Sequence, residues 1–278
     1  MTTLISRNLQ EIGSEALATF PAVVIQGARR VGKSTFSDML TKDRPRRFLT
    51  LDDTGTRAAA VADPKAFVSQ SPDSTLVIDE IQRLPELILE VKAAIDRANS
   101  PGRFVLTGSS NLLRLRRTPD SLAGRAVTLN LGGFSQGELV GAKEDFAGYL
   151  FELGTIDSVL SPADFTTEWS REDYAQAIVR GSYPEVQNLS LRMRNLWLRS
   201  YVERLTERDA EDVIPSLTAS RLQATLRALA ANQSGEMVKS RIAEVADLPA
   251  TTVTRYLDTL ETLYLASGVP PWTANLAK

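Results

Sequence analysis

The chain has 278 residues, of which 43% are hydrophobic and 24% are charged, and its formal net charge is -2. This composition is typical of a globular protein with one large or two to three small domains. The sequence contains neither cysteine nor histidine, which excludes disulfides, thiolate chemistry, zinc sites built on these residues and histidine-based triads. No run approaches the roughly 18 apolar residues that indicate a membrane span. We therefore expect a cytoplasmic protein with no membrane partner.

The first two thirds of the chain alternate strand-like and helix-like segments, the pattern of a parallel sheet covered by helices on both faces. Apolar residues between Leu87 and Ile95 recur at helical spacing and predict one crossover helix. The expected fold class is therefore α/β. The five predicted strands are buried-looking runs bounded by Gly, Pro, Asp or Ser, at residues 22–26, 47–51, 75–78, 103–107 and 126–130.

Beyond Gly141 the strand signals fade and helical patterns take over. The predicted helices cover residues 171–179, 191–209, 221–231, 239–246 and 251–265. On the last of them Val253, Leu257, Leu260 and Tyr264 form a core-facing stripe, so the final unit resembles a winged helix-turn-helix. We accordingly divide the chain into an α/β core at 1–142, a helical region at 143–215 and a winged-helix-like unit at 216–278.

Residues 27–34 read Gly-Ala-Arg-Arg-Val-Gly-Lys-Ser, which fits the Walker A pattern of a P-loop. The string lies between an apolar strand and a predicted helix at 34–40, so backbone N–H groups at the helix N-terminus would wrap phosphates. Lys33 is expected to reach the β- and γ-phosphates, and Ser34 is expected to bind Mg²⁺. The predicted nucleotide-binding residues are Gly27, Ala28, Arg29, Arg30, Val31, Gly32, Lys33, Ser34 and Thr35.

A second motif, Leu76-Val77-Ile78-Asp79-Glu80, is an apolar strand that ends in two acids and matches Walker B. Asp79 is expected to hold Mg²⁺, usually through water, while Glu80 would orient and polarise the water that attacks the γ-phosphate. A glutamate directly after the magnesium aspartate favours hydrolysis of ATP, and it is rare in small-molecule kinases, the alternative that would use the same P-loop. The two motifs together predict ATP and Mg²⁺ as ligands.

The strand at 103–107 runs into a polar loop, Gly108-Ser109-Ser110-Asn111. In ATPases with an extra strand between the two Walker strands, a polar residue at this place senses the γ-phosphate and helps to place the water. Thr107, Ser109 and Asn111 are the candidates, and the sequence does not distinguish them. A polar loop without such a role is the alternative.

Arg125 follows a glycine just before the fifth predicted strand. Its guanidinium would neutralise transition-state charge either in its own subunit or across to a neighbour in a homo-oligomer. A surface arginine without a catalytic role is the equally weighted alternative. Arg114, Arg116 and Arg117 form a small basic cluster nearby that would suit a phosphate backbone or an acidic partner, although most such clusters are simply solvated.

Six strings make essentially the whole chain resemble the prokaryotic AAA-type ATPases that carry a C-terminal domain of unknown function. They occupy residues 26–35, 78–87, 104–110, 121–125, 134–138 and 181–185. The resemblance implies a P-loop NTPase core with strand order 5-1-4-3-2, followed by helices, a winged-helix unit and a further C-terminal domain. Ser182 stands where the family usually has a second glycine. The chain ends at residues 270–278, where family members continue, so the resemblance implies a truncated C-terminus.

The leading interpretation is a magnesium-dependent ATPase whose nucleotide cycle moves a C-terminal effector region. The alternative is a nucleotide-gated regulator with little turnover that binds DNA or protein through residues 216–278. Thr252, Thr254 and Arg255 would then contact a DNA groove. That segment has six basic and five acidic residues, and a net charge of +1 is a weak electrostatic footprint for DNA. The biological client and the oligomeric state are not fixed by the sequence.

Overall fold

The computed structural model describes residues 4–109, 122–142, 167–210, 217–233 and 235–269, together with residues 144, 145, 148, 151 and 214. Asn111, the basic cluster at 114–117 and residues 270–278 lie outside the described residues. No helix within the described ranges is long and apolar enough to cross a membrane. The expected cytoplasmic location stays a prediction.

Five parallel strands form one sheet in the order β2-β3-β4-β1-β5. The predicted order is confirmed, since it is the same order read from the other edge. The strands β1, β3 and β4 are buried along their whole length, because both faces of the sheet are covered. The bounds, each within one residue of the prediction, are β1 (Ala22–Gln26), β2 (Arg46–Thr50), β3 (Thr75–Asp79), β4 (Phe104–Gly108) and β5 (Ala126–Asn130).

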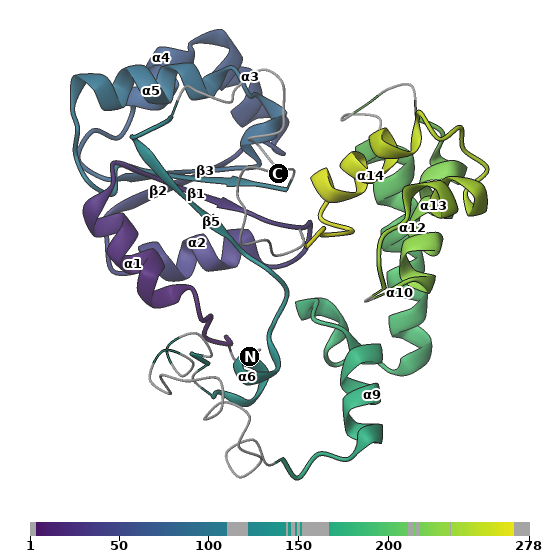
Figure 1. The fold of residues 1–278 in the computed structure, drawn as a ribbon. Helices are drawn as coiled ribbons and strands as arrows, with labels where there is room; N and C mark the ends of the chain where they lie inside the picture. The colour runs from purple at the N-terminus through teal and green to yellow at the C-terminus, as the bar shows by residue number, and fades with distance from the viewer. Residues whose placement is uncertain are drawn as a thin grey trace.

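Each face of the sheet has its own apolar core, because successive side chains of a strand point to opposite faces. Val24 and Leu106 pack on one face with residues of α3, α4 and α5. Val23 and Val105 pack on the other face with residues of α1 and α2, and Figure 1 shows these two helical layers. The helices are α1 (Gln10–Thr19), α2 (Lys33–Thr41), α3 (Thr54–Ala62), α4 (Pro64–Ser69) and α5 (Leu87–Arg97).

The other described elements are helices, and the predicted ends are confirmed to within three residues for four of the five predicted helices. The fifth, predicted at 191–209, is an α-helix as far as Arg204 and a π-helical turn from Leu205 to Asp209. After a short helix, α6, the chain forms two longer helices and then the three helices of the last unit (Figure 1). The elements are α6 (Gln136–Val140), α9 (Arg171–Arg180), η3 (Pro184–Val186), α10 (Leu191–Arg204), the π-helical turn η4 (Leu205–Asp209), α12 (Ala219–Ala231), α13 (Lys239–Val245) and α14 (Val253–Thr262). Residues 217–233 and 235–269 contain no strand, so the wing and the three-part division stay predictions.

The last three helices pack around a cluster of their own, to which Val253, Leu257 and Leu260 contribute three of the four residues of the predicted stripe. Tyr264 differs from the prediction, because it packs against the apolar cluster of the sheet instead. The physical reason is that α14 ends at Thr262 and Tyr264 adopts a left-handed backbone with φ of +57°. The C-terminal unit therefore touches the α/β core through this residue.

Gly27 follows β1 directly, at a position where a side chain does not fit. Its φ is +157°, and an added Cβ would lie 2.1 Å from the carbonyl oxygen of Leu131. That backbone cannot easily retreat, because the Leu131 N–H donates to the carbonyl of Gln26 at 2.8 Å.

The substitution Gly27→Ala is expected to lower the free energy of unfolding by about 2 kcal/mol or more, because the backbone must shift to admit the methyl group. Urea denaturation monitored by circular dichroism measures this change. Gly55→Ala is the matched control, since a Cβ there meets no atom closer than 3.4 Å and lies in a helix. Unfolding curves of the two variants that coincide would contradict the prediction.

Candidate functional site

The loop between β1 and α2 presents a set of free backbone donors. No backbone carbonyl of the described residues accepts a hydrogen bond from the N–H groups of residues 28–32. Arg30 and Gly32 adopt left-handed conformations, with φ of +65° and +93°, and α2 begins immediately afterwards. Alternating conformations of this kind turn successive N–H groups toward one centre, and the N-terminus of a helix favours negative charge. The geometry therefore fits the predicted phosphate-binding loop.

Lys33 places a positive charge inside this loop. Its side chain is buried, and its ammonium Nζ donates to the carbonyl oxygens of Gly27 at 3.2 Å and Ala28 at 2.9 Å. Burial lowers the pKa of Lys33 to about 8, although the carboxylates of Glu80 and Asp79 act in the opposite direction. At neutral pH the loop therefore holds a cation that an anionic ligand would contact.

Asp79 contacts two other predicted site residues at the carboxyl edge of the sheet. It is the last residue of β3 and is buried, and its Oδ1 accepts hydrogen bonds from the hydroxyls of Ser34, at 2.8 Å, and Thr107. Carboxylate and hydroxyl oxygens are ligands that suit Mg²⁺. The described residues contain no group of three His, Cys, Asp or Glu side chains that would hold a metal alone.

Glu80 is fixed directly beside this cluster. Its backbone is left-handed with φ of +58°, and its N–H donates to the Thr107 hydroxyl at 3.2 Å. Its Oε2 accepts hydrogen bonds from the Gln82 amide and from the Ser109 hydroxyl, the latter at 2.9 Å. A non-glycine residue in this conformation costs on the order of 1–3 kcal/mol, and such strain is typical of functional sites.

Gln82 was not predicted to belong to the site. Its amide nitrogen donates to Ser109 Oγ at 2.7 Å, and its amide oxygen accepts from the Ser109 N–H at 3.3 Å. It lies in the short turn η1 (Ile81–Arg83) that follows Glu80, which returns its side chain to the carboxylate. A glutamine two residues after the Walker B glutamate was the available signal.

Arg125 is not brought to this site. It precedes β5 at the amino end of the sheet, whereas the P-loop follows the carboxyl end of β1. Five residues of strand separate the two edges by about 16 Å. Its guanidinium instead pairs with Asp96 in α5 and donates to the carbonyl of Ala123 at 3.3 Å. The expected role within its own subunit therefore conflicts with the position of Arg125, and the role across subunits stays a prediction.

The side chains of the two P-loop arginines contact the C-terminal helical region. Arg29 pairs with Asp209 of η4 at 3.1 Å, and Arg30 pairs with Glu185 of η3 at 3.1 Å. The Tyr201 hydroxyl, from α10, donates to the backbone carbonyl of Arg29 at 2.9 Å. The sequence indicated phosphate binding by the backbone of Arg29 and Arg30, and it did not reveal these partners.

A buried ion pair supports the loop from the other side. Arg7 and Glu138 lie 3.1 Å apart and are both buried. The Arg7 guanidinium also donates to the carbonyl of Val31 at 3.2 Å and to the carbonyls of residues 132 and 133. Arg7 therefore ties the P-loop to the segment that follows β5. Its position near the start of the chain offered no sequence signal for this role.

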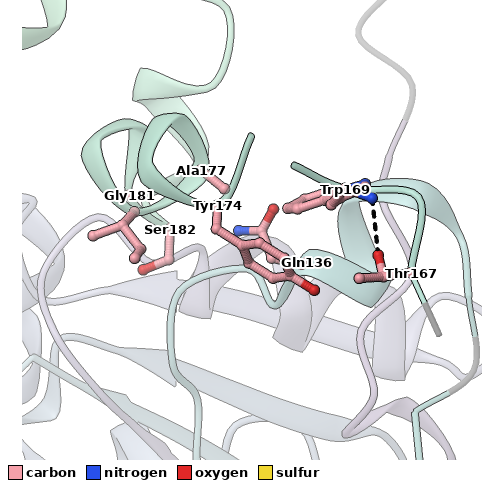
Figure 2. A pocket seen from close by; sticks show the side chains of 8 residues that line it. Gln136, Thr167, Trp169, Tyr174, Ala177, Gly181 and Ser182 are labelled. Carbon is pink, nitrogen blue, oxygen red and sulfur yellow. Dashed lines mark hydrogen bonds between the residues drawn. The ribbon is translucent and has the colours of Figure 1, made fainter. Parts of the chain in front are cut away.

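A second hollow lies between α6 and α9, and Figure 2 shows its lining side chains. It is an open pocket of about 460 Å³. The rings of Trp169 and Tyr174 in its lining pack edge to face, with their centroids 5.2 Å apart. None of the predicted nucleotide-site residues lines it. The lining residues are Gln136, Thr167, Trp169, Tyr174, Ala177, Ile178, Gly181 and Ser182.

Comparison with known families agrees with this geometry. Residues 19–140 match the model of an AAA domain, and residues 171–278 match that of a domain of unknown function (DUF8612). The chain thus combines an AAA domain with a C-terminal domain of unknown function. The AAA domain supports the general assignment of an ATP-binding ATPase.

Individual relatives extend the comparison over most of the chain. The uncharacterized proteins Mb2031c of Mycobacterium bovis and Rv2008c of Mycobacterium tuberculosis are each 28% identical to it over 268 residues, which cover 95% of this chain and 53% of theirs. The chain thus spans about half the length of the curated relatives it matches. The structural match with the Walker-type ATPase PABY2304 of Pyrococcus abyssi covers 94% of this chain and 90% of that protein's chain, with a TM-score of 0.55 and 14% sequence identity. That likeness shows a shared fold.

Affinity for ATP is expected to fall as pH rises through about 8, because Lys33 loses its proton in the free protein there. Below that pH the charge is present and the affinity stays constant. Above it the dissociation constant rises by up to about tenfold per pH unit. Equilibrium titrations between about pH 7 and 9.5 measure this dependence, in a range where the chain has no histidine or cysteine to titrate. A Lys33→Met variant should bind weakly with no such slope, and a wild-type affinity independent of pH would contradict the assignment.

Proposed function

We propose that the chain is a magnesium-dependent ATP hydrolase. The observation that carries the proposal is the convergence of the free N–H groups of residues 28–32, the Lys33 ammonium and the Asp79 carboxylate at one edge of the sheet. These groups match the anionic phosphates and the hard cation of a nucleotide complex. The AAA domain supports the same conclusion.

Each residue has one task in this proposal. The N–H groups of residues 28–32 and the first turn of α2 bind the phosphates, while Lys33 neutralises charge on the β- and γ-phosphoryl oxygens. Ser34 and Asp79 hold Mg²⁺, which when bound neutralises further negative charge on the phosphates. The Thr107 hydroxyl donates to the Asp79 carboxylate and accepts from the Glu80 N–H. It therefore fixes the positions of the two acids relative to each other.

Glu80 acts on the water. Among the described residues, the side-chain donors that bind its carboxylate are Gln82 and Ser109, and both contact Oε2. We assign Oε1 to the water molecule. Glu80 accepts the water's hydrogen bond and takes up its proton as the water oxygen bonds to the γ-phosphorus and the bond to the bridging oxygen breaks. Gln82 and Ser109 keep the carboxylate aimed during this step.

Glu80→Gln is expected to bind ATP normally and to lose at least about 100-fold in turnover, because the amide cannot take the proton. Lys33→Ala is expected to lose both binding and turnover. Phosphate release from ATP without an added acceptor measures turnover, distinguishes a hydrolase from a kinase, and should stop when Mg²⁺ is chelated. Glu86→Gln is the matched control, since this exposed acid lies six residues further along the chain. Wild-type turnover in Glu80→Gln would refute the mechanism.

Gln82→Ala is expected to lower kcat about tenfold with little change in KM, because among the described residues its amide contacts Glu80 and Ser109 and no residue of the P-loop. Steady-state phosphate release over a range of ATP concentrations separates the two constants. Gln70→Ala serves as the control, since the Gln70 amide donates to the Phe67 carbonyl at the end of α4 and, among the described residues, has no other hydrogen bond. An increase in KM without a change in kcat would be inconsistent with a positioning role for Gln82.

A further inference from the structure

The P-loop is also a contact surface for the C-terminal helical region. Three bonds meet there: Tyr201 to the carbonyl of Arg29, Asp209 to the Arg29 guanidinium, and Glu185 to the Arg30 guanidinium. The first of them is unlike the other two, because it engages the backbone of the loop. A side chain about 170 residues further along the chain thus fixes one peptide group of the predicted phosphate site.

The orientation of that peptide group determines where the next N–H points. A trans peptide is planar, so the C=O of Arg29 and the N–H of Arg30 point in opposite directions. Tyr201 binds the C=O from the side of α10, and the Arg30 N–H is thereby turned away from α10. No backbone carbonyl of the described residues accepts that N–H. The Tyr201 bond therefore fixes the direction of a donor that no backbone carbonyl of the described residues accepts, on the side of the peptide opposite α10.

Tyr201 is well held for this task. Its side chain is buried, its ring stacks on Trp197 with centroids 5.0 Å apart and planes at 9°, and its other neighbour is Tyr183 at 5.0 Å. Burial raises the pKa of the Tyr201 hydroxyl, and the neighbouring Tyr183 acts in the same direction. The hydroxyl therefore keeps its proton and remains a donor to the Arg29 carbonyl.

The Arg29–Asp209 pair holds the same residue from its side chain. Arg29 and Asp209 are only partly exposed, at 32% and 22% of their side-chain surface. Burial acts to lower the pKa of Arg29, but the nearby carboxylates of Asp209, Glu80 and Asp52 together have a larger effect. The pKa of Arg29 is therefore raised. The guanidinium is thus within electrostatic reach of the catalytic candidate Glu80, and pairing with Asp209 keeps it directed to η4.

We propose that Tyr201 and Asp209 are positioning residues for nucleotide binding, acting through the backbone and the side chain of Arg29. The proposal rests on the proposed function, since it assigns these residues to the same phosphate site. It gives the domain of unknown function a direct part in that site: the junction of α10 and η4 sets the geometry of one phosphate-binding N–H group. The ligand is the polyphosphate of the nucleotide, which every nucleoside triphosphate shares.

The test is the Tyr201→Phe variant of the full chain. The ring and its stacking remain while the hydroxyl is lost, and we expect ATP to bind about 3- to 10-fold more weakly. KM should rise by the same factor with kcat at saturation nearly unchanged, because the Arg30 N–H contacts the phosphates in the ground state and the transition state alike. A merely structural role would lower the unfolding midpoint without this division between KM and kcat.

Tyr256→Phe is the matched control, because Tyr256 is also buried, and its hydroxyl accepts from the Thr218 N–H far from the P-loop. It is expected to bind ATP as the wild type does. A second pair of variants removes one negative charge each from η4: Asp209→Asn should weaken ATP binding, and Glu207→Gln, at an exposed position two residues away, should not.

The outcomes separate the two proposals. Wild-type affinity in both Tyr201→Phe and Asp209→Asn, in a chain that binds and hydrolyses ATP, would overturn the positioning role and leave the proposed function intact. A wild-type chain that binds no ATP would overturn the proposed function itself. Equal weakening by Asp209→Asn and Glu207→Gln would assign the effect of Asp209 to long-range charge and remove it from the proposal.

Discussion

The arrangement of this site depends on one constraint, which is that the N–H groups of residues 28–32 have no backbone acceptor among the described residues. Leaving such groups unpaired costs free energy in the absence of a ligand, so hydrogen bonds of these N–H groups do not hold the loop in this conformation. Within the loop the Lys33 ammonium binds the carbonyls of Gly27 and Ala28, and further contacts come from outside. β1 pairs on both sides with β4 and β5, Arg7 binds the carbonyl of Val31, and Tyr201 binds the carbonyl of Arg29.

The charges around the loop follow from the same constraint. The buried Lys33 ammonium is stabilised by two loop carbonyls and by the nearby acids, and burial still lowers its pKa. Asp79 in turn shares its Oδ1 between two hydroxyls, which keeps its carboxylate within reach of the first turn of α2. The loop thus supplies a positive charge and the acids supply negative charges a short distance away. The positive loop is complementary to a phosphate, and the acids are complementary to a divalent cation.

Much of the fold could be predicted because the central strands are uniformly apolar and end at Gly, Asp or Ser. The helix α3 was missed, since its Ala-rich sequence buries only Ala60 and has little periodicity. Lys33, Ser34, Asp79 and Glu80 could be predicted as site residues because their motifs are local. No local pattern marks Arg7, Tyr201 and Asp209. Each contacts a P-loop residue that lies between 24 and 180 positions away in the sequence. The position of Arg125 could have been predicted from the sequence. Arg125 precedes β5 and the P-loop follows β1, and in a parallel sheet the starts and the ends of strands lie at opposite edges.

The contacts of Arg29 and Arg30 change what the P-loop has to accomplish. At positions 29 and 30 a loop used only for phosphates would need the backbone, and the side chains there would be free to vary. Here the Arg29 side chain pairs with η4 and the Arg30 side chain pairs with η3. The Arg29 carbonyl accepts a hydrogen bond from α10. Because the C=O and N–H of one peptide are rigidly coupled, the C-terminal region cannot leave that carbonyl without releasing the N–H on its other side. Any movement of this region during a nucleotide cycle must therefore either preserve the Tyr201 bond or alter the phosphate site.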